Sequence, residues 1–152
     1  MADAVIRFEN VYKSFGAQKV LENVSFEVPR GSALCILGRS GTGKSVTIKQ
    51  LIGLIKPDAG HIYVEGRDVT AMNAAELSRA RRRIGFLFQY SALFDSISVG
   101  ENVAFPLRRH TNLKEDAIRE LVEKKLARVG LRGIYDKMPP EISGGMQKRV
   151  GL

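Results

Sequence analysis

Gly38-Arg39-Ser40-Gly41-Thr42-Gly43-Lys44-Ser45 fits the pattern G-x-x-x-x-G-K-[ST] at every fixed position. The run before it, Ala33-Leu34-Cys35-Ile36-Leu37, is short and continuously apolar, which predicts a strand buried on both faces. After it, apolar residues recur at helical spacing, at Val46, Ile48, Leu51, Ile52 and Ile55. We therefore expect the glycine-rich stretch to connect a strand to a helix in an α/β protein.

The residue types in this stretch suit a phosphate chain. Its glycines let the backbone curl so that successive N–H groups point inward, and the helix that follows begins at its positive end. Lys44 can reach the outer phosphates, and the Ser45 hydroxyl can ligate Mg²⁺. The alternative is an ordinary glycine-rich turn. The four fixed positions and their flanks favour a P-loop that binds a nucleoside triphosphate.

The composition is that of one globular domain, with 44% hydrophobic and 26% charged residues. The single cysteine, Cys35, excludes an intramolecular disulfide or a cysteine metal cluster and suits a reducing cytoplasm. No apolar run approaches the roughly 18 residues of a membrane span, and Met1 to Ala4 lack the features of a signal peptide. We expect any membrane role to come through a partner.

The net charge of +8 fits an anionic partner or a solvated surface. The densest basic cluster consists of Arg79, Arg81, Arg82 and Arg83. No aromatic residues are interleaved with it for stacking on bases, so we expect no nucleic-acid binding.

An antiparallel layer is predicted before the P-loop. Apolar side chains at Ile6, Phe8, Val11 and Tyr12 indicate a first strand, and those from Val20 to Val28 indicate a second. The turn at Gly16-Ala17-Gln18-Lys19 joins them. Tyr12 and Phe15 lie in this hairpin, and either ring suits stacking on an adenine. Core packing is the alternative for both.

Beyond the P-loop helix, the breakers of Lys56-Pro57-Asp58-Ala59-Gly60 predict a turn, followed by a strand at His61–Val64 and a helix at Ala74–Arg83. Ile84-Gly85-Phe86-Leu87-Phe88 predicts a second buried strand, which ends on Gln89. Open α/β sheets bind ligands at the carboxyl ends of their strands. Gln89 is therefore a candidate for ligating Mg²⁺ or positioning the attacking water.

Two helices are predicted next. The first spans Val99 to Phe105, with Ser98 as its cap, and Pro106 is expected to interrupt or kink it. Asn112 is expected to cap the second, and Gly130 suits its C-terminal cap. Its apolar stripe, which we interpret as a core contact, consists of Ile118, Leu121, Val122, Leu126 and Val129, and its expected ion pair is Glu120–Lys124.

The prolines of Met138-Pro139-Pro140-Glu141-Ile142 disfavour a helix, and Ser143-Gly144-Gly145 then begins one. A hydroxyl and bare N–H groups at a helix start offer a second anion site. A simple N-cap is the alternative.

These motifs, in this order, resemble the ATP-binding subunit of an ABC transporter, from about Ile6 to Leu152. The implied fold is α/β, a P-loop NTPase core whose mixed sheet is flanked by helices, with an N-terminal antiparallel β layer and an α-helical subdomain. The resemblance implies that Phe15 stacks on adenine. It also implies that the signature motif, Ser143, Gly144 and Gly145, contacts the ATP of a partner subunit. The implied Walker A contacts to ATP are Gly38, Arg39, Ser40, Gly41, Thr42, Gly43, Lys44, Ser45 and Val46.

The resemblance implies catalytic roles for Lys44 and for Gln89, as the Q-loop glutamine, and implies that Ser45 and Gln89 ligate Mg²⁺. It divides the chain into the ATP-binding core with its antiparallel layer (1–89), a helical subdomain contacting membrane subunits (90–142) and the start of the signature helix (143–152).

In the family, the Walker B aspartate, the catalytic glutamate and the switch histidine all follow the signature. The chain ends at Leu152, so the C-terminal part of the core is missing from this sequence. We expect the full-length subunit to be an ATPase. The 152 residues alone are expected to hold nucleotide with negligible turnover and to melt broadly.

Met146 stands where the signature usually has glutamine. Three stretches, together with this methionine, are similar to the Mla-type branch of ABC transporters, at 89–96, 101–108 and 138–146. That branch works with MCE-domain proteins to move phospholipids or related lipids between membranes of the bacterial envelope. The implied partners are a second copy in a head-to-tail ATP sandwich, integral membrane permease subunits and an MCE-domain lipid-binding protein. The implied location is the cytoplasmic side of the bacterial inner membrane.

Three alternatives remain open. One is an ABC ATPase for another solute, and another is a nucleotide-binding module without turnover. The last is a P-loop protein of DNA repair or chromosome maintenance, in which a long coiled coil separates the P-loop from the signature. Fewer than 100 residues separate Ser45 from Ser143 here, without sustained heptads, which disfavours it.

Overall fold

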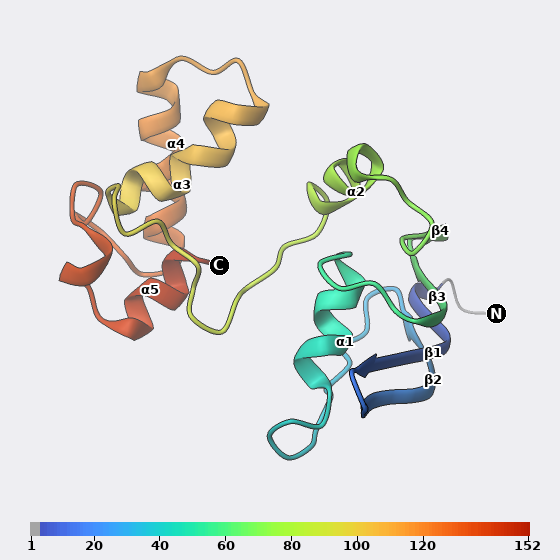
Figure 1. Cartoon of the computed structure of the whole chain (residues 1–152). Coiled ribbons are helices and arrows are strands. Elements are labelled where there is room, and N and C mark those ends of the chain that lie inside the picture. The colour runs from blue at the N-terminus through green and yellow to red at the C-terminus, as the bar shows by residue number, and fades with distance from the viewer. Residues whose placement is uncertain (1–3) are drawn as a thin grey trace. The chain divides into compact units, whose positions relative to one another are not determined.

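The computed structural model describes residues 4–152, drawn in Figure 1. Its internal contacts divide the chain into two compact units, the first ending at Ile84 and the second spanning Gly85–Leu152. Each unit has its own cluster of buried apolar side chains.

An antiparallel sheet organises the first unit. It consists of β1 (Ala4–Phe15), β2 (Gln18–Pro29), β3 (Ala59–Val64) and β4 (Arg67–Asp68), in the order β2-β1-β3-β4. Every neighbouring pair is antiparallel, which confirms the predicted layer before the P-loop and the predicted strand after it.

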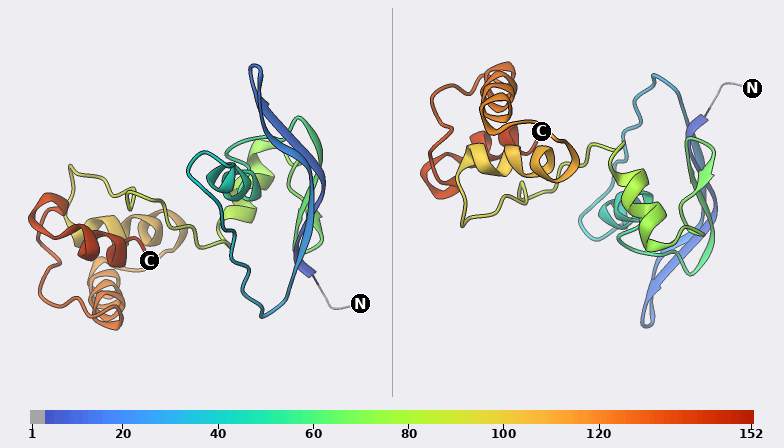
Figure 2. Two further views of the ribbon diagram at one scale, coloured as in Figure 1. Left: turned by 90° about the horizontal axis from the view of Figure 1, so that it is seen from below. Right: turned by 90° about the horizontal axis from the view of Figure 1, so that it is seen from above.

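Helices α1 (Lys44–Leu51) and α2 (Ala74–Arg81) lie next to each other on one side of this sheet (Figure 2). A Cβ on Gly53, just after α1, would come within 2.6 Å of Leu77 Cδ2 in α2, so the two helices touch closely there. The core beneath them is formed by Phe8, Val11, Leu21, Ile62, Val69 and Leu77. The sheet thus provides a base on which the helix that follows the P-loop is seated.

Arg81, one of the clustered arginines, has a structural role. Its Nε and Nη2 donate hydrogen bonds to the carbonyl oxygens of Ile52, at 2.8 Å, and Gly53, at 3.1 Å. Carbonyls at a helix end lack partners within the helix, so Arg81 satisfies groups that α1 leaves open.

Gln50 in α1 is a buried polar side chain without a partner. It is 1% exposed, and neither its Nε2 nor its Oε1 forms a hydrogen bond within residues 4–152. A buried amide that has lost water without gaining a partner destabilises the folded state.

Both predictions of a buried strand beside the P-loop and Gln89 are wrong. Neither Ala33–Leu37 nor Ile84–Phe88 forms a strand, and Cys35, Leu37 and Leu87 are exposed. A strand needs a neighbour for its backbone N–H and C=O groups, and no segment of residues 4–152 pairs with either run. An apolar run indicates a tendency to be buried between strands, but it does not provide those strands.

The second unit is helical, with α3 (Val99–His110), α4 (Glu115–Arg128), a 3₁₀ turn η1 (Pro139–Glu141) and α5 (Gly144–Val150). The predicted stripe on α4 faces the core, where Ile118, Val122 and Leu126 are buried. The Glu120–Lys124 ion pair forms at 2.5 Å. Gly130 follows α4 at a positive φ of 73°, as a C-terminal cap requires.

Three helix predictions need correction. Helix α3 is not interrupted at Pro106 and continues to His110, because a capping box at Ser98 and Glu101 and the bond from Thr111 N–H to Leu107 O at 2.9 Å secure its two ends. Helix α4 is capped at Lys114 rather than Asn112, with the acid of Glu115 in its first turn.

The third correction concerns Pro139 and Pro140, which begin a 3₁₀ turn. Proline is tolerated there because the first N–H groups of a helix have no partner to lose.

The loop before α3 is held by Asn102. Its Oδ1 accepts from Phe94 N–H at 2.7 Å, and its Nδ2 donates to the carbonyls of Phe94, Ile97 and Ser98. The N-terminus of α3 is tied in turn to the segment before η1, because Val99 N–H and Gly100 N–H donate to Lys137 O and Tyr135 O, each at 2.8 Å.

No helix within residues 4–152 is both long and apolar enough to span a bilayer.

Candidate nucleotide-binding site

The loop that leads into α1 has a backbone that only glycine fits at Gly43. Its φ of 90° lies in the left-handed region. A Cβ there would also lie 2.9 Å from Leu21 Cδ2 and 3.1 Å from the carbonyl oxygen of Val20. The start of α1 is therefore pressed against β2, a few residues beyond the turn that carries Phe15.

Lys44 folds back across this loop. Its ammonium donates hydrogen bonds to the carbonyl oxygens of Gly38, at 2.8 Å, and Arg39, at 2.6 Å. The Thr42 hydroxyl also donates to Arg39 O, at 2.9 Å. A positive charge is thus held inside a short ring of backbone.

The donors in this ring fit a phosphate chain. Within residues 4–152, no protein acceptor takes a hydrogen bond from the backbone N–H groups of 40–46. These free donors, the Lys44 charge and the positive end of α1 all favour an anion. Ser45 is exposed on the first turn of α1, where a hydroxyl can join the ligands of a phosphate-bound cation.

Phe15 lies at the end of β1, directly before the turn, and its side chain is 49% exposed. Tyr12 is 41% exposed, so neither ring is packed away in the core. The Lys13 ammonium lies 5.4 Å from the centroid of the Phe15 ring. An accessible flat ring of this kind can stack on a base.

Sequence reasoning missed Asp58, which the structure connects to this hairpin. Its Oδ1 and Oδ2 accept hydrogen bonds from Lys13 Nζ and Ser14 N–H, each at 2.6 Å. The bond from Lys13, followed by that from Ser14, lowers the pKa of this carboxyl. From the sequence, Asp58 is predicted only to be part of a turn rich in helix breakers. The residues around Asp58 do not indicate its contact with Ser14, which lies 44 positions away.

Gln89 and Ser143 belong to the second unit. Gln89 is exposed in a turn rather than at the end of a strand, and the Ser143 hydroxyl accepts from Met146 N–H at 3.3 Å as the cap of α5. A Cβ on Gly144 or Gly145 would meet nothing within 4 Å, so packing does not explain these glycines.

The structure brings the Gln89 segment and the signature helix together. A Cβ on Gly151, at the end of α5, would lie 3.0 Å from Leu87 Cδ1 and 3.1 Å from Ser91 O. In the first unit it likewise brings the P-loop against the strand that follows Phe15. The predicted site residues thus fall into two groups, one in each unit.

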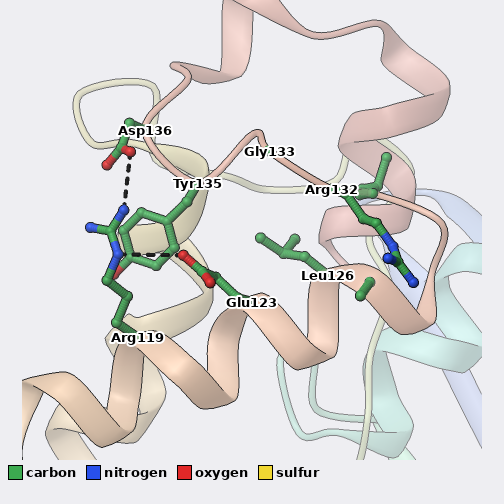
Figure 3. A pocket seen from close by; sticks show the side chains of 9 residues that line it. Arg119, Glu123, Leu126, Arg132, Gly133, Tyr135 and Asp136 are labelled. Atoms are coloured by element: carbon green, nitrogen blue, oxygen red, sulfur yellow. Dashed lines mark hydrogen bonds and ion pairs between the residues drawn. The ribbon is translucent and has the colours of Figure 1, made fainter.

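A cavity of about 510 Å³ opens between α4 and the loop that follows it (Figure 3). At one end, Arg119 lies 3.4 Å from Glu123 and 3.1 Å from Asp136, and its guanidinium stacks over the Tyr135 ring at 4.1 Å. The cavity contains none of the predicted site residues. Its paired charges fasten the segment that leads to the signature motif onto α4.

Comparison with known proteins gives a consistent result. The family model described as ABC transporter matches residues 21–152. The chain is 49% identical over 147 residues to the "Probable ribonucleotide transport ATP-binding protein mkl" of Mycobacterium tuberculosis, covering 97% of the chain and 41% of that protein. It is 41% identical over 152 residues to the "Intermembrane phospholipid transport system ATP-binding protein MlaF" of Haemophilus influenzae, covering 100% of the chain and 58% of MlaF.

The solved dimeric structure of the ATP-binding cassette MJ0796 bound to ADP and Pi is 29% identical, with a TM-score of 0.88, over 96% of the chain and 66% of that structure. The chain thus spans from about two fifths to about two thirds of the length of these proteins.

Proposed function

The chain belongs to the ABC transporter family. We propose that it is the ATP-binding part of a subunit that energises transport of phospholipids or related lipids. The geometry of the P-loop is the observation that supports ATP binding most strongly. The Lys44 ammonium is held inside a ring of free N–H donors at the start of α1.

Each site residue has a proposed task. The N–H groups of 40–46 and Lys44 hold the phosphates, and Phe15 stacks on the adenine. Ser45 and Gln89 are the proposed Mg²⁺ ligands, because hydroxyl and amide oxygens are the kind of hard ligand that this cation takes. The ion, when bound, neutralises charge on the phosphates. Gln89 positions the water that attacks the γ-phosphate, and Lys44 neutralises charge on the β- and γ-phosphates as the bond to the ADP leaving group breaks.

Two copies are proposed to sandwich ATP head to tail. The solved relative bound to ADP and Pi is dimeric, which supports this arrangement. Ser143, Gly144 and Gly145 would then face the phosphates bound by the partner's P-loop. Packing within the chain does not demand Gly144 or Gly145, which supports a role in close approach to a ligand.

The membrane partners are proposed to dock on residues 90–142, which lie in the sequence between the ATP-binding core at 1–89 and the signature helix from 143. The exposed rings of Phe94 and Phe105 lie 5.2 Å apart in this region, and Tyr90 is 85% exposed. Exposed aromatic side chains of this kind favour a protein interface. This docking would hold the subunit at the cytoplasmic face of the bacterial inner membrane.

Lipid is the proposed cargo, with an MCE-domain protein as a further partner. The relative named for intermembrane phospholipid transport matches the whole chain, which supports this cargo. Met146 in the signature supports the same branch. The relative named for probable ribonucleotide transport is 49% identical, so ribonucleotide is the second candidate.

The decisive experiment reconstitutes the full-length subunit with its permease subunits in liposomes and follows a fluorescent phospholipid moving to acceptor vesicles. We expect transfer that depends on ATP and is lost in Lys44→Ala. If ATP leaves lipid transfer unchanged but drives uptake of a labelled ribonucleotide, the second candidate replaces the first.

For the 152 residues alone, we propose a nucleotide holder with negligible turnover. Asp95, Asp116 and Asp136 do not follow buried strands, and Asp136 is already paired with Arg119, so none resembles a carboxylate that supports Mg²⁺. Phosphate release that disappears in Lys44→Ala would overturn this proposal.

A further inference from the structure

The turn after α1 contacts the end of β1 through several hydrogen bonds of Asp58. Asp58 N–H donates to Tyr12 O at 2.9 Å, and Tyr12 is in register with Ala59 of β3. Through its carboxylate, Asp58 also holds Lys13 and the backbone of Ser14, each at 2.6 Å. Asp58 therefore contacts each of the three residues that precede Phe15.

The backbone of this turn has its own support. Gly60 adopts a φ of 89°, and a Cβ there would overlap the carbonyl groups of Glu9 and Asn10. Strand β3 is thus fixed against β1 by close contact and hydrogen bonds. These contacts join the two strands without the Asp58 carboxylate. The two bonds of that carboxylate, to Lys13 and Ser14, instead hold the residues that precede Phe15.

The bond between Asp58 and Lys13 also concerns the Phe15 ring. The Lys13 side chain is only 15% exposed, and its ammonium lies between the Asp58 carboxylate at 2.6 Å and the Phe15 centroid at 5.4 Å. An aromatic ring has two faces, and Lys13 lies over one of them. Phe15 as a whole is 49% exposed, so its ring remains accessible to a base.

We propose that Asp58 is a positioning residue for the nucleotide base, because its carboxylate holds Lys13 against one face of Phe15 and fixes the Ser14 backbone beside it. This inference rests on the proposed ATP site, with Phe15 as the stacking residue. A ring held in place loses less freedom when a base stacks on it, so binding is tighter. Asp58 acts on the base and leaves the contacts to the phosphates unchanged.

The test compares two ligands of the purified protein, ATP and inorganic triphosphate, by calorimetric titration with Mg²⁺. We expect Asp58→Ala to weaken ATP binding about 5-fold, a fraction of the stacking contribution of one base, and to leave triphosphate binding unchanged. Lys13→Met, which keeps the bond from Ser14 N–H to Asp58, should show a smaller loss that is equally selective for ATP. Asp58→Asn keeps an acceptor for Ser14 N–H and should recover part of the affinity.

Glu22→Ala is the matched control, because Glu22 also pairs with a lysine of the sheet, Lys19 at 3.1 Å, and its carboxylate bonds to this lysine rather than to Lys13 or Ser14. It should leave both ligands unaffected. A double variant of Asp58→Ala with Phe15→Ala should bind ATP as weakly as Phe15→Ala alone.

Three results would overturn the inference while leaving the proposed function standing. They are equal losses for ATP and triphosphate in Asp58→Ala, undiminished ATP binding in both Asp58→Ala and Lys13→Met, or fully additive losses in the double variant. If the unaltered protein bound neither ligand, the proposed function itself would be refuted, and this inference with it.

Discussion

Arg81 Nε donates a hydrogen bond to the carbonyl oxygen of Ile52, 2.8 Å away, although the two residues are 29 positions apart. This bond closes the end of α1, whose beginning carries the P-loop. Arg81 belongs to the basic cluster for which the sequence suggested an anion-binding or solvated surface. In the structure it instead caps the C-terminal end of α1.

Replacing Arg81 should therefore destabilise the first unit. We expect Arg81→Ala to lower the free energy of unfolding by about 1–2 kcal/mol, because two carbonyls lose a charged donor. Arg79→Ala is the control, since Arg79 is an exposed arginine of the same helix. Urea denaturation followed by circular dichroism measures both, and equal midpoints for the two variants would contradict the role of Arg81.

Lys44 should dominate the phosphate contacts. We expect Lys44→Ala to weaken ATP binding about 10- to 100-fold, the contribution of a charge-assisted hydrogen bond. Lys49→Ala, in the last turn of the same helix, removes an equal charge far from the loop and should change binding little. Titration with a fluorescent ATP analogue distinguishes them, and similar affinities for the two variants would rule out a specific role for Lys44.

Gln50 should be replaceable by an apolar residue with a gain in stability. Its amide is buried without a partner, so Gln50→Leu is expected to raise the free energy of unfolding by about 1–2 kcal/mol. Gln50→Glu, of similar shape, should destabilise instead because it buries a carboxyl group. Thermal melts would show the opposite shifts, and a lower melting temperature for Gln50→Leu would indicate that the amide has a partner.

Gly100 should resist replacement although it lies in a helix. Alanine usually stabilises a helix by up to about 1 kcal/mol relative to glycine. A Cβ on Gly100 would overlap the Tyr135 ring, however, and overpacking of this kind costs about 1–3 kcal/mol. We expect a net loss of stability, in contrast to Gly85→Ala, where a Cβ meets nothing within 4 Å. Denaturant titration decides the sign.

Acid should weaken the hold of β4 on β3 through Asp68. Burial alone would raise the pKa of this carboxyl, but hydrogen bonds from the Thr70 hydroxyl, His61 and Thr70 N–H together lower it below 3.8. A lowered folded-state pKa means that the stabilisation is complete above 3.8 and is lost as the pH falls through the folded value.

The stability difference between the protein and Asp68→Asn should therefore shrink as the pH falls below about 4. Asp95→Asn is the control, because Asp95 is an exposed carboxylate outside this sheet. A difference that persists unchanged to pH 2 would contradict the assignment.

The features that the sequence predicted well depend on near neighbours. The hairpin around Gly16, the caps at Ser98 and Ser143 and the glycine of the left-handed cap at Gly130 are all set by a few adjacent residues. The P-loop belongs to this class, because its glycines and its lysine act on the same short ring.

The features that the sequence did not predict depend on distant partners. The run Ala33–Leu37 is apolar enough for a central strand, but pairing decides whether a strand forms. Asp58 and Arg81 satisfy groups that lie far away along the chain, and nothing near them indicates which groups those are. The N-cap of α4 is Lys114 rather than the predicted Asn112, because a single capping residue does not fix a helix boundary to within one or two positions.

The four hydrogen bonds of Asn102 have a mechanical consequence. They tie the loop before α3 to the first turn of that helix, so we expect a displacement at Phe94 to move α3 with it. From there the bonds of Val99 and Gly100 pass it to the segment at 135–137, and Gln147 Nε2, bonded to Pro139 O at 2.9 Å, carries it into the helix that Ser143 caps. Hydrogen bonds thus connect the segment at Phe94, through α3 and the segment at 135–137, to the helix that Ser143 caps.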